Sequence, residues 1–398
     1  MARCAPPSRR AHCPGEDENK VKPRVGIIGA GFIGRFHAWA VRGLVGMGLV
    51  DAEYVGVCDR DEERARQFAE TAGLSLCTTD PDELIGSPEV NTVYVCTPTG
   101  SHRDLVLKAA RADKAVFCEK PLARNLEEAR QMRDAVVAAG VPHQVGLVLR
   151  HSPIFTVLKD LMADPDLGRP MAVILRDDQF FPIQGHYQSD WRKDYDVAGG
   201  GALIEHSIHD LDLLTWLIGD VQAVAARTRN FAGHQGVEDL ASVWLRFRNG
   251  AEGHLVSVWH NVLSRPSLRN IEVFWENGYF ACDQDMFGEL RHQTRATPDG
   301  VLSREEVNER YLALVGLSGA EHMEALTRYS LEDYFFLRDL TEGRRPFPGF
   351  EVALRAHELV DAVYRSAAEG RQVALPALGR GTAAAEAAAG GDSGSDDP

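Results

Sequence analysis

The sequence predicts two domains: a Rossmann domain with a doubly wound parallel sheet, and an α+β domain with a large, mostly antiparallel open sheet. Three observations support this fold class. With 398 residues, of which 44% are hydrophobic, the chain can bury two cores. Short apolar runs alternate with amphipathic helical segments over residues 23–150. Strand-like runs then follow one another within residues 151–375, the expected second domain, which is typical of an antiparallel sheet.

The first domain is expected to alternate strands and helices from residue 24 onward. Parallel strands are buried on both faces, so each should be a nearly continuous apolar run. The strand-like runs are "RVGIIGAG", "AEYVGVCD", "VNTVYVCTP", "KAVFCEKP" and "HQVGLVLR". Between them, helices are expected over residues 36–44, 62–71, 102–112 and 125–139.

The second domain should begin with a helix near residues 153–163, a strand at "PMAVILRDDQFF" and a helix after "GGG". Five strand-like runs come next: "VQAVAARTRN", "LASVWLRFRN", "AEGHLVSVWHN", "RNIEVFWEN" and "GYFACDQD". Because "RNG" and "ENG" favour hairpin turns, we expect these runs to form an antiparallel meander. Two late helices, near residues 332–342 and 351–369, complete the folded part.

The two ends of the chain are expected to be disordered tails, over residues 1–22 and 379–398. The first has arginines but no apolar segment of a secretory signal, and the second is a low-complexity run without large apolar residues. No apolar run reaches the length of a membrane span, so we expect no membrane association.

Charge and cysteine content narrow the class of protein further. A net charge of -15 argues against nucleic acid or an anionic membrane as the main partner. The seven cysteines contain no C-x-x-C pair and fall mostly in apolar strand-like runs, which indicates reduced, buried thiols. We therefore expect a cytoplasmic enzyme that acts on a small molecule.

A phosphate-binding loop is predicted at "VGIIGAGFIG", where Gly29, Gly31 and Gly34 form a G-x-G-x-x-G pattern between a strand and a helix. Glycines at these positions allow a tight turn and let backbone N–H groups approach a pyrophosphate at the helix N-terminus. Phe32 and Ile33 lie inside the same pattern. These five residues are expected to bind a dinucleotide.

The next strand ends at Asp59, where a carboxylate can accept hydrogen bonds from both hydroxyls of the adenosine ribose. This acid favours NAD, because a 2'-phosphate would meet a like charge. Arg60 follows directly, and a guanidinium there can stack on adenine or pair with a 2'-phosphate. NAD is thus the expected cofactor, and NADP remains possible.

A candidate catalytic lysine stands in "AVFCEKPLA", at the end of the fourth strand. Ligands of open α/β sheets bind at the C-terminal ends of the strands, so Lys120 should point into the cleft beside a nicotinamide ring. Pro121 would fix the backbone behind it, through a cis bond in one interpretation. Four further residues are expected near the cofactor in the same crevice: Glu119, and Thr97, Pro98 and His102 of "CTPTGSH".

The stretch "GGGALIEHSIHDLD" adds two histidines and three acids. On one continuous helix, Glu205, His209 and Asp212 would share one face, with His206 and Asp210 on another. A metal site of Glu205, His206, His209 and Asp210 is an alternative, but no second ligand cluster has a fitting spacing, so no metal is expected. A second alternative is that these polar groups only bond across a domain interface, which is our interpretation of His206 and Asp210.

In order and spacing, "GAGFIGRFHA", "VCDRD", "CTPTGSH", "CEKPLA" and "AGGGALIEHSIHDLDLLTWLIG" resemble the Gfo/Idh/MocA oxidoreductase family over residues 24–371. The resemblance implies that Lys120 binds the substrate hydroxyl or assists proton transfer and that His209 is the acid/base. Glu205 stands where the family commonly has an aspartate that orients the substrate. The resemblance also implies a homo-oligomer, dimer or tetramer, formed through the open sheet.

Together these observations predict an NAD(P)-dependent oxidoreductase that interconverts a secondary alcohol and a ketone on a sugar, sugar derivative or cyclitol. Lys120 and His209 would carry the proton chemistry, and Glu205 would position the substrate. Trp191 and Arg192 could add an apolar wall and a cation beside a polyol, with His186 and Tyr187 as weaker candidates. Two alternatives stay open: a lyase or glycosidase with tightly bound, recycled NAD, and a non-catalytic dinucleotide-binding sensor.

Overall fold

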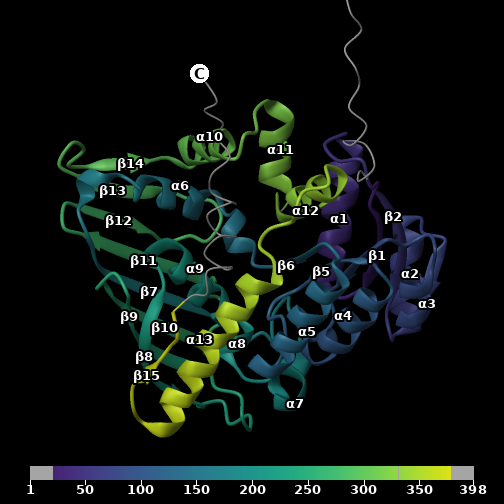
Figure 1. Cartoon of the computed structure of the whole chain (residues 1–398), viewed down its shortest axis with the longest axis horizontal. Coiled ribbons are helices and arrows are strands. Elements are labelled where there is room, and N and C mark those ends of the chain that lie inside the picture. Colours follow the sequence, from purple (N-terminus) through teal and green to yellow (C-terminus); the bar gives the residue numbers. More distant parts are fainter. Residues whose placement is uncertain (1–20, 330, 378–398) are drawn as a thin grey trace, which may run out of the picture.

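The structure, a computed structural model, describes residues 21–329 and 331–377. The two expected tails lie outside these residues, apart from positions 21 and 22. The described residues form two sheets, one of nine strands and one of six. Figure 1 shows the two sheets side by side, with helices packed around and between them. Within the described part of the chain, no helix is both long and apolar enough to cross a membrane.

The first sheet has six parallel strands in the order β3-β2-β1-β4-β5-β6, which confirms the predicted Rossmann fold. Its central strands are apolar on both faces, and every residue of β4 and β5 is buried. Because the strand order reverses between β1 and β4, the ends of these strands open a crevice. The strands are β1 (Arg24–Ile28), β2 (Glu53–Cys58), β3 (Leu76–Thr78), β4 (Thr92–Val95), β5 (Ala115–Cys118) and β6 (His143–Val145).

The helices of the first domain follow the predicted order, with one addition. α1 begins at Phe32, earlier than expected, because the helix starts directly after the glycine turn. α3 was not expected, since six residues are too few to show a helical period, although Asp80 caps it and Pro81 opens it. The helices are α1 (Phe32–Gly46), α2 (Glu62–Ala72), α3 (Pro81–Gly86), α4 (His102–Arg111) and α5 (Leu126–Ala139).

The second sheet has the order β14-β13-β12-β11-β7-β10-β9-β8-β15, and it corrects the expected meander. The predicted hairpins β9–β10 and β11–β12 are present. However, β7 lies between β10 and β11, and it runs parallel to β10. The strands are β7 (Pro170–Phe180), β8 (Val221–Arg229), β9 (Leu240–Phe247), β10 (Glu252–His260), β11 (Leu268–Trp275), β12 (Gly278–Cys282), β13 (Leu290–Thr294), β14 (Gly300–Leu302) and β15 (Val373–Ala374).

The expected single helix after "GGG" is interrupted. α8 ends at Glu205, and α9 starts at Ile208 after a turn in which His206 leaves the helical conformation, with φ -123° and ψ -62°. The remaining helices are α6 (Pro153–Leu161), α7 (Tyr195–Ala198), α8 (Ala202–Glu205), α9 (Ile208–Ile218), α10 (Arg304–Leu314), α11 (Ala320–Arg328), α12 (Leu331–Thr341) and α13 (Phe350–Glu369). Three of these helices, α7, α10 and α11, were not expected. Four strands were not expected either: β3 in the first sheet, and β13, β14 and β15 in the second.

The last two helices bring the end of the chain back to the first domain. α12 contacts α1, and α13 packs against α5 as well as against α9 and β8. α13, yellow in Figure 1, thus runs between the two sheets. Phe350 and Val352 at its start are buried in the same apolar cluster as residues of β4 and β5. The crevice at the ends of β1, β4 and β5 is therefore built from both halves of the sequence.

Candidate active site

The predicted phosphate loop joins β1 to α1 in the geometry that a dinucleotide needs. Gly29 has φ +104°, and a Cβ atom there would come within 2.5 Å of the Cys96 carbonyl oxygen. A Cβ on Gly34 would overlap the Gly29 carbonyl, so helix and loop touch at this point. In contrast, a Cβ on Gly31 would meet no atom within 4 Å, which leaves open space in front of α1. No side chain among the described residues caps this helix N-terminus.

A hollow of about 500 Å³ lies against this loop and fits a bound dinucleotide. Phe32, which is half exposed, is one of the residues that line it. The segment after β7 lines one side of it: the His186 and Tyr187 rings lie 5.8 and 5.9 Å from the Phe32 ring, centroid to centroid. Its lining residues are Ala30, Gly31, Phe32, Arg35, Phe36, Trp39, Arg64, His186, Tyr187 and Gln188.

Asp59 stands at the end of β2, where its carboxylate already has protein partners. One oxygen accepts a hydrogen bond from the N–H of Ala30 at 2.8 Å, and the other from the N–H of Asp61 at 2.9 Å. Asp59 therefore holds the phosphate loop against β2. Its nearest basic partner is Arg64, at 3.3 Å, which lines the dinucleotide hollow, whereas Arg60 is exposed. Arg64 was not identified from the sequence. Its position could have suggested it, because Arg64 is in the first turn of α2, the helix that follows Asp59.

The "CTPTGSH" segment supports the crevice from behind. His102 is buried, with its two ring nitrogens 3.0 Å from the Pro121 carbonyl oxygen and 2.8 Å from the Thr97 carbonyl oxygen. It thus ties the loop after β4 to the loop after β5. Thr97 and Pro98 are half-buried, and the Thr97 hydroxyl accepts a hydrogen bond from Ser101 at 2.8 Å.

Lys120 follows β5 and enters the crevice, with a cis peptide bond to Pro121. Its ammonium donates a hydrogen bond to the main-chain carbonyl of Glu205 at 2.8 Å. Burial lowers the pKa of Lys120 to about 8, the positive charge of Arg192 adds to this shift, and the carboxylates of Glu119 and Glu205 oppose it. Near neutral pH the amine is therefore close to its titration point, which suits a group that polarises or protonates a substrate oxygen.

Glu205 is fully buried and joins three segments of the site. Its carboxylate accepts a hydrogen bond from the Thr99 hydroxyl at 2.7 Å and one from Arg192 Nε at 3.0 Å. The Arg192 guanidinium in turn lies 4.4 Å from the centroid of the Trp191 ring. Glu205 thereby fixes Arg192 and Trp191 beside Lys120. Thr99 was not identified from the sequence as a site residue. Its partner Glu205 is 106 residues further along the chain, and no local sequence pattern indicates such a contact.

His209, in the first turn of α9, has the properties of a neutral base. It is 7% exposed, and its Nδ1 has no hydrogen-bond partner among the described residues. Burial lowers the pKa of His209 well below its usual value, and the positive charges of Lys120 and Arg269 lower it further. The imidazole is thus unprotonated at neutral pH and can accept a proton.

The expected common face of Glu205, His209 and Asp212 does not form, because the chain turns between α8 and α9. Asp212 instead makes a buried two-point ion pair with Arg150, at 2.9 and 2.8 Å. Asp212 therefore belongs to the packing of α9 against the segment after β6. Among the expected residues of this stretch, Glu205 and His209 remain beside Lys120.

His206 and Asp210 lie in a buried network below the site. Arg269 on β11 pairs with Asp210 at 2.5 Å and with Asp177 on β7 at 3.3 Å. His206 Nε2 lies 2.8 Å from the Asp177 carboxylate. Arg269 and Asp177 both belong to the second domain, so His206 and Asp210 bond within that domain and not, as expected, across a domain interface. The four residues of the alternative metal site, Glu205, His206, His209 and Asp210, are not among the groups of described residues whose ligand atoms lie close enough to share an ion.

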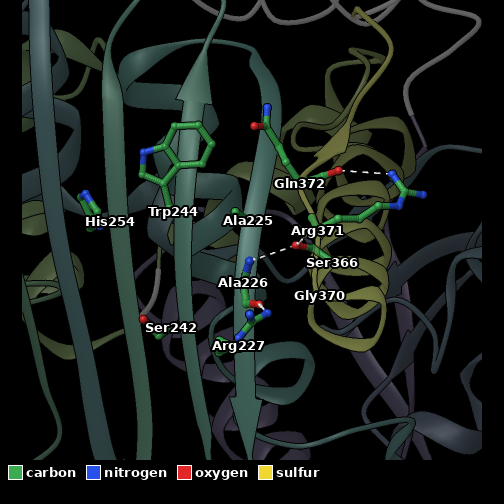
Figure 2. A pocket seen from close by; sticks show the side chains of 10 residues that line it. All are labelled: Ala225, Ala226, Arg227, Ser242, Trp244, His254, Ser366, Gly370, Arg371 and Gln372. Carbon is green, nitrogen blue, oxygen red and sulfur yellow. Dashed lines mark hydrogen bonds between the residues drawn. The ribbon is translucent and has the colours of Figure 1, made fainter.

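A second hollow, of about 410 Å³, opens on the outer face of the nine-stranded sheet (Figure 2). Trp244 and His254 extend from neighbouring strands there, and the Ser366 hydroxyl accepts a hydrogen bond from the N–H of Ala226 at 3.0 Å. None of the candidate site residues lines this hollow, which is bordered by Ala225, Ala226, Arg227, Ser242, Trp244, His254, Ser366, Gly370, Arg371 and Gln372.

Comparison with known proteins agrees with this architecture. Residues 23–147 match an oxidoreductase family with an NAD-binding Rossmann fold, and residues 155–281 match the Gfo/Idh/MocA C-terminal domain. The inositol 2-dehydrogenase of Rhizobium meliloti (strain 1021) is 30% identical over 359 residues, which cover 88% of this chain and 99% of that protein. The 1,5-anhydro-D-fructose reductase of Ensifer adhaerens is 30% identical over 300 residues, 75% of this chain and 80% of that protein.

Solved structures share the fold over nearly the whole chain. An oxidoreductase domain protein from Kribbella flavida superposes with a TM-score of 0.77 at 27% identity, covering 89% of this chain and 100% of that one. A levoglucosan dehydrogenase in complex with NADH and levoglucosan has a TM-score of 0.77 at 24% identity, covering 90% of this chain and 100% of that one. At that identity the second likeness concerns the fold.

A glycine-rich loop before α1, an acid at the end of β2 and a partly buried lysine after β5 define an NAD(P)-dependent oxidoreductase. The chain belongs to the Gfo/Idh/MocA oxidoreductase family, and its first domain is the NAD-binding Rossmann domain of that family.

Proposed function

We propose that the protein interconverts a secondary alcohol and a ketone on a sugar, sugar derivative or cyclitol, with NAD as the preferred hydride carrier. The observation that carries this proposal is the meeting of Lys120, His209 and the Arg192–Glu205 pair at the end of β5. It is supported by relatives whose names describe an inositol dehydrogenase and an anhydrofructose reductase.

The chain supplies residues that would bind the cofactor and residues that would contact the substrate. Gly29, Gly31 and Gly34, with Phe32 and Ile33, would hold the pyrophosphate at the start of α1. Asp59 would face the adenosine ribose, with Thr97, Pro98 and Glu119 on the nicotinamide side. When bound, the nicotinamide ring would accept or donate the hydride. Trp191 and Arg192 would contact the substrate, and Glu205 would act on it through Arg192.

The proton would move between the substrate hydroxyl and His209. The imidazole is neutral because burial and two nearby cations disfavour its charged form, so it can take the hydroxyl proton as the C–H bond breaks. The Lys120 ammonium would stabilise the developing charge on the oxygen. In the reverse direction the same groups would deliver the proton to the carbonyl oxygen.

The test is the absorbance of reduced nicotinamide after mixing the protein with NAD or NADP and a panel of inositols, aldoses and anhydrosugars. Lys120→Met and His209→Asn should each lower kcat by about 100-fold or more, with little change in the affinity for NADH. Unchanged turnover in both variants would refute the proposed roles.

A second candidate is a lyase or glycosidase that recycles tightly bound NAD. It is favoured by the contacts of His186 and Tyr187 with Phe32 at the edge of the dinucleotide hollow, which would slow cofactor release. Nicotinamide dinucleotide released only on denaturation, together with substrate cleavage without net reduction of added NAD, would favour this candidate over the dehydrogenase.

We also propose a homo-oligomer, dimer or tetramer, formed through the outer face of the nine-stranded sheet. Ile174, Val256 and Phe274 expose apolar side chains on this face, where Trp244 is only half-buried. Sedimentation of the purified protein tests this proposal, and Val256→Arg should weaken the assembly by placing a charge on the face.

A further inference from the structure

A buried histidine bridges two carboxylates directly behind Lys120. His37 on α1 is fully buried; its Nδ1 lies 2.9 Å from an oxygen of Asp333, and its Nε2 lies 2.9 Å from an oxygen of Glu119. A carboxylate only accepts hydrogen bonds, so both contacts are satisfied when the imidazole carries two protons. Burial opposes this charge, but the carboxylates of Asp333 and Glu119 outweigh it and raise the pKa of His37 well above its usual value.

The surroundings of His37 are apolar and acidic. The rings of Tyr94 and Phe117 pack against the imidazole at centroid distances of 5.5 and 5.0 Å. A carboxylate oxygen of Glu332 lies within 4.8 Å of a ring nitrogen of His37 and of a carboxylate oxygen of Glu119. The titratable groups around His37 are Asp333 and Glu332 on α12, Glu119 and Lys120 after β5, and Tyr94 and Cys96 on and after β4.

Glu119 connects His37 to Lys120. Its second carboxylate oxygen accepts a hydrogen bond from the N–H of Lys120 at 3.0 Å. The carboxylate packs over Gly146, where a Cβ atom would come within 2.8 Å of it. Burial alone would raise the pKa of Glu119, but hydrogen bonding and charge from His37 lower it, so this acid stays ionised. Its negative charge then favours the ammonium form of Lys120.

We propose that the Asp333–His37–Glu119 bridge is a positioning device that fixes both the main chain and the charge environment of Lys120. His37 and Asp333 are positioning residues, because they act on Lys120 through Glu119. The bridge also connects α12, late in the chain, to the catalytic loop of the first domain. The proposal rests on the proposed function for the role of Lys120, but its structural part can be tested without turnover.

The experiment measures the protonation of Lys120 directly. Trace labelling of the full-length protein with acetic anhydride, read by mass spectrometry of the Lys120 peptide across a pH series, gives the titration midpoint of this amine. In His37→Gln, Glu119 loses the cation whose hydrogen bond and charge lower its pKa, so its carboxylate is protonated more readily and supports the ammonium form of Lys120 less. The midpoint of Lys120 should therefore fall by about one pH unit or more. Asp333→Asn should produce a smaller fall, and it offers a milder variant if His37→Gln does not fold.

His143→Gln is the matched control, because His143 is also a buried histidine but makes no hydrogen bond to a carboxylate of the described residues; it accepts one from the N–H of Phe350 at 3.2 Å. It should leave the Lys120 midpoint unchanged. An unchanged or raised midpoint in folded His37→Gln and Asp333→Asn would overturn the proposal. A lowered midpoint in a protein that turns over none of the polyols would support the bridge and count against the proposed function instead. With an active substrate, the pH profile of kcat should shift in the same direction.

Discussion

The substitution Glu205→Asp tests whether the site depends on the side-chain length of this glutamate. The Glu205 carboxylate meets the Thr99 hydroxyl at 2.7 Å and Arg192 Nε at 3.0 Å. Removing one methylene withdraws the carboxylate by about 1.5 Å, so with the backbone in place both contacts become too long for hydrogen bonds.

The size of the effect follows from these two contacts. A hydrogen bond to a charged group contributes about 1.5–3 kcal/mol, and partial relaxation or water should recover some of this energy. We expect a net loss of about 2 kcal/mol in transition-state stabilisation, which is about a thirtyfold fall in kcat/KM. Because Arg192 is proposed to bind the substrate, much of the loss should appear in KM.

The assay is steady-state reduction of NAD with an active polyol, accompanied by a thermal unfolding curve. Glu128→Asp is the control, because Glu128 is also buried and paired with an arginine, Arg124, but lies on α5. It should lower stability without a comparable loss of kcat/KM. Wild-type kcat/KM in Glu205→Asp would refute the reasoning, since the family's usual aspartate would then serve equally well here.

Three further predictions follow from the same geometry. Asp59→Ser should raise kcat/KM with NADP relative to NAD by about tenfold or more, because a 2'-phosphate no longer meets a like charge and Arg64 keeps only Asp61 as an acidic partner; an unchanged ratio would count against this role of Asp59. Alcohol oxidation should decline as the pH rises through about 8, where Lys120 loses its proton, and a rate that keeps rising past that pH would contradict an ammonium role. Asp212→Asn should lower the free energy of unfolding by about 3 kcal/mol, because it removes the charge of the carboxylate from a buried two-point ion pair; urea unfolding measures this, and a loss below about 1 kcal/mol would show that the pair is not critical.

Local patterns in the sequence predicted those parts of the site that local geometry controls. The phosphate loop follows from the conformations that Gly29 and Gly34 must adopt, and the place of Lys120 follows from the end of a buried parallel strand. The family resemblance added the roles of His209 and Glu205, which remain proposals.

Long-range contacts account for the parts that could not be predicted. The start of α8 is held by Glu238, whose carboxylate accepts hydrogen bonds from the N–H groups of Gly201 at 2.9 Å and Leu203 at 2.8 Å. Ser207 in the turn donates to Asp177 at 3.2 Å. The helical periodicity of residues 199–218 gives no information about these distant partners. The insertion of β7 between β10 and β11 is a pairing of distant segments, which alternation within each strand does not specify.

The most direct test of the central claim follows a deuterium label from substrate to cofactor. Ring-deuterated myo-inositol and levoglucosan are incubated with NAD and the protein, and the reduced nicotinamide and the product are analysed by mass spectrometry. The account predicts one deuterium on the nicotinamide ring and a ketone product, with both signals lost in His209→Asn. Deuterium released to water without any label on nicotinamide would contradict direct hydride transfer and the assignment of this site.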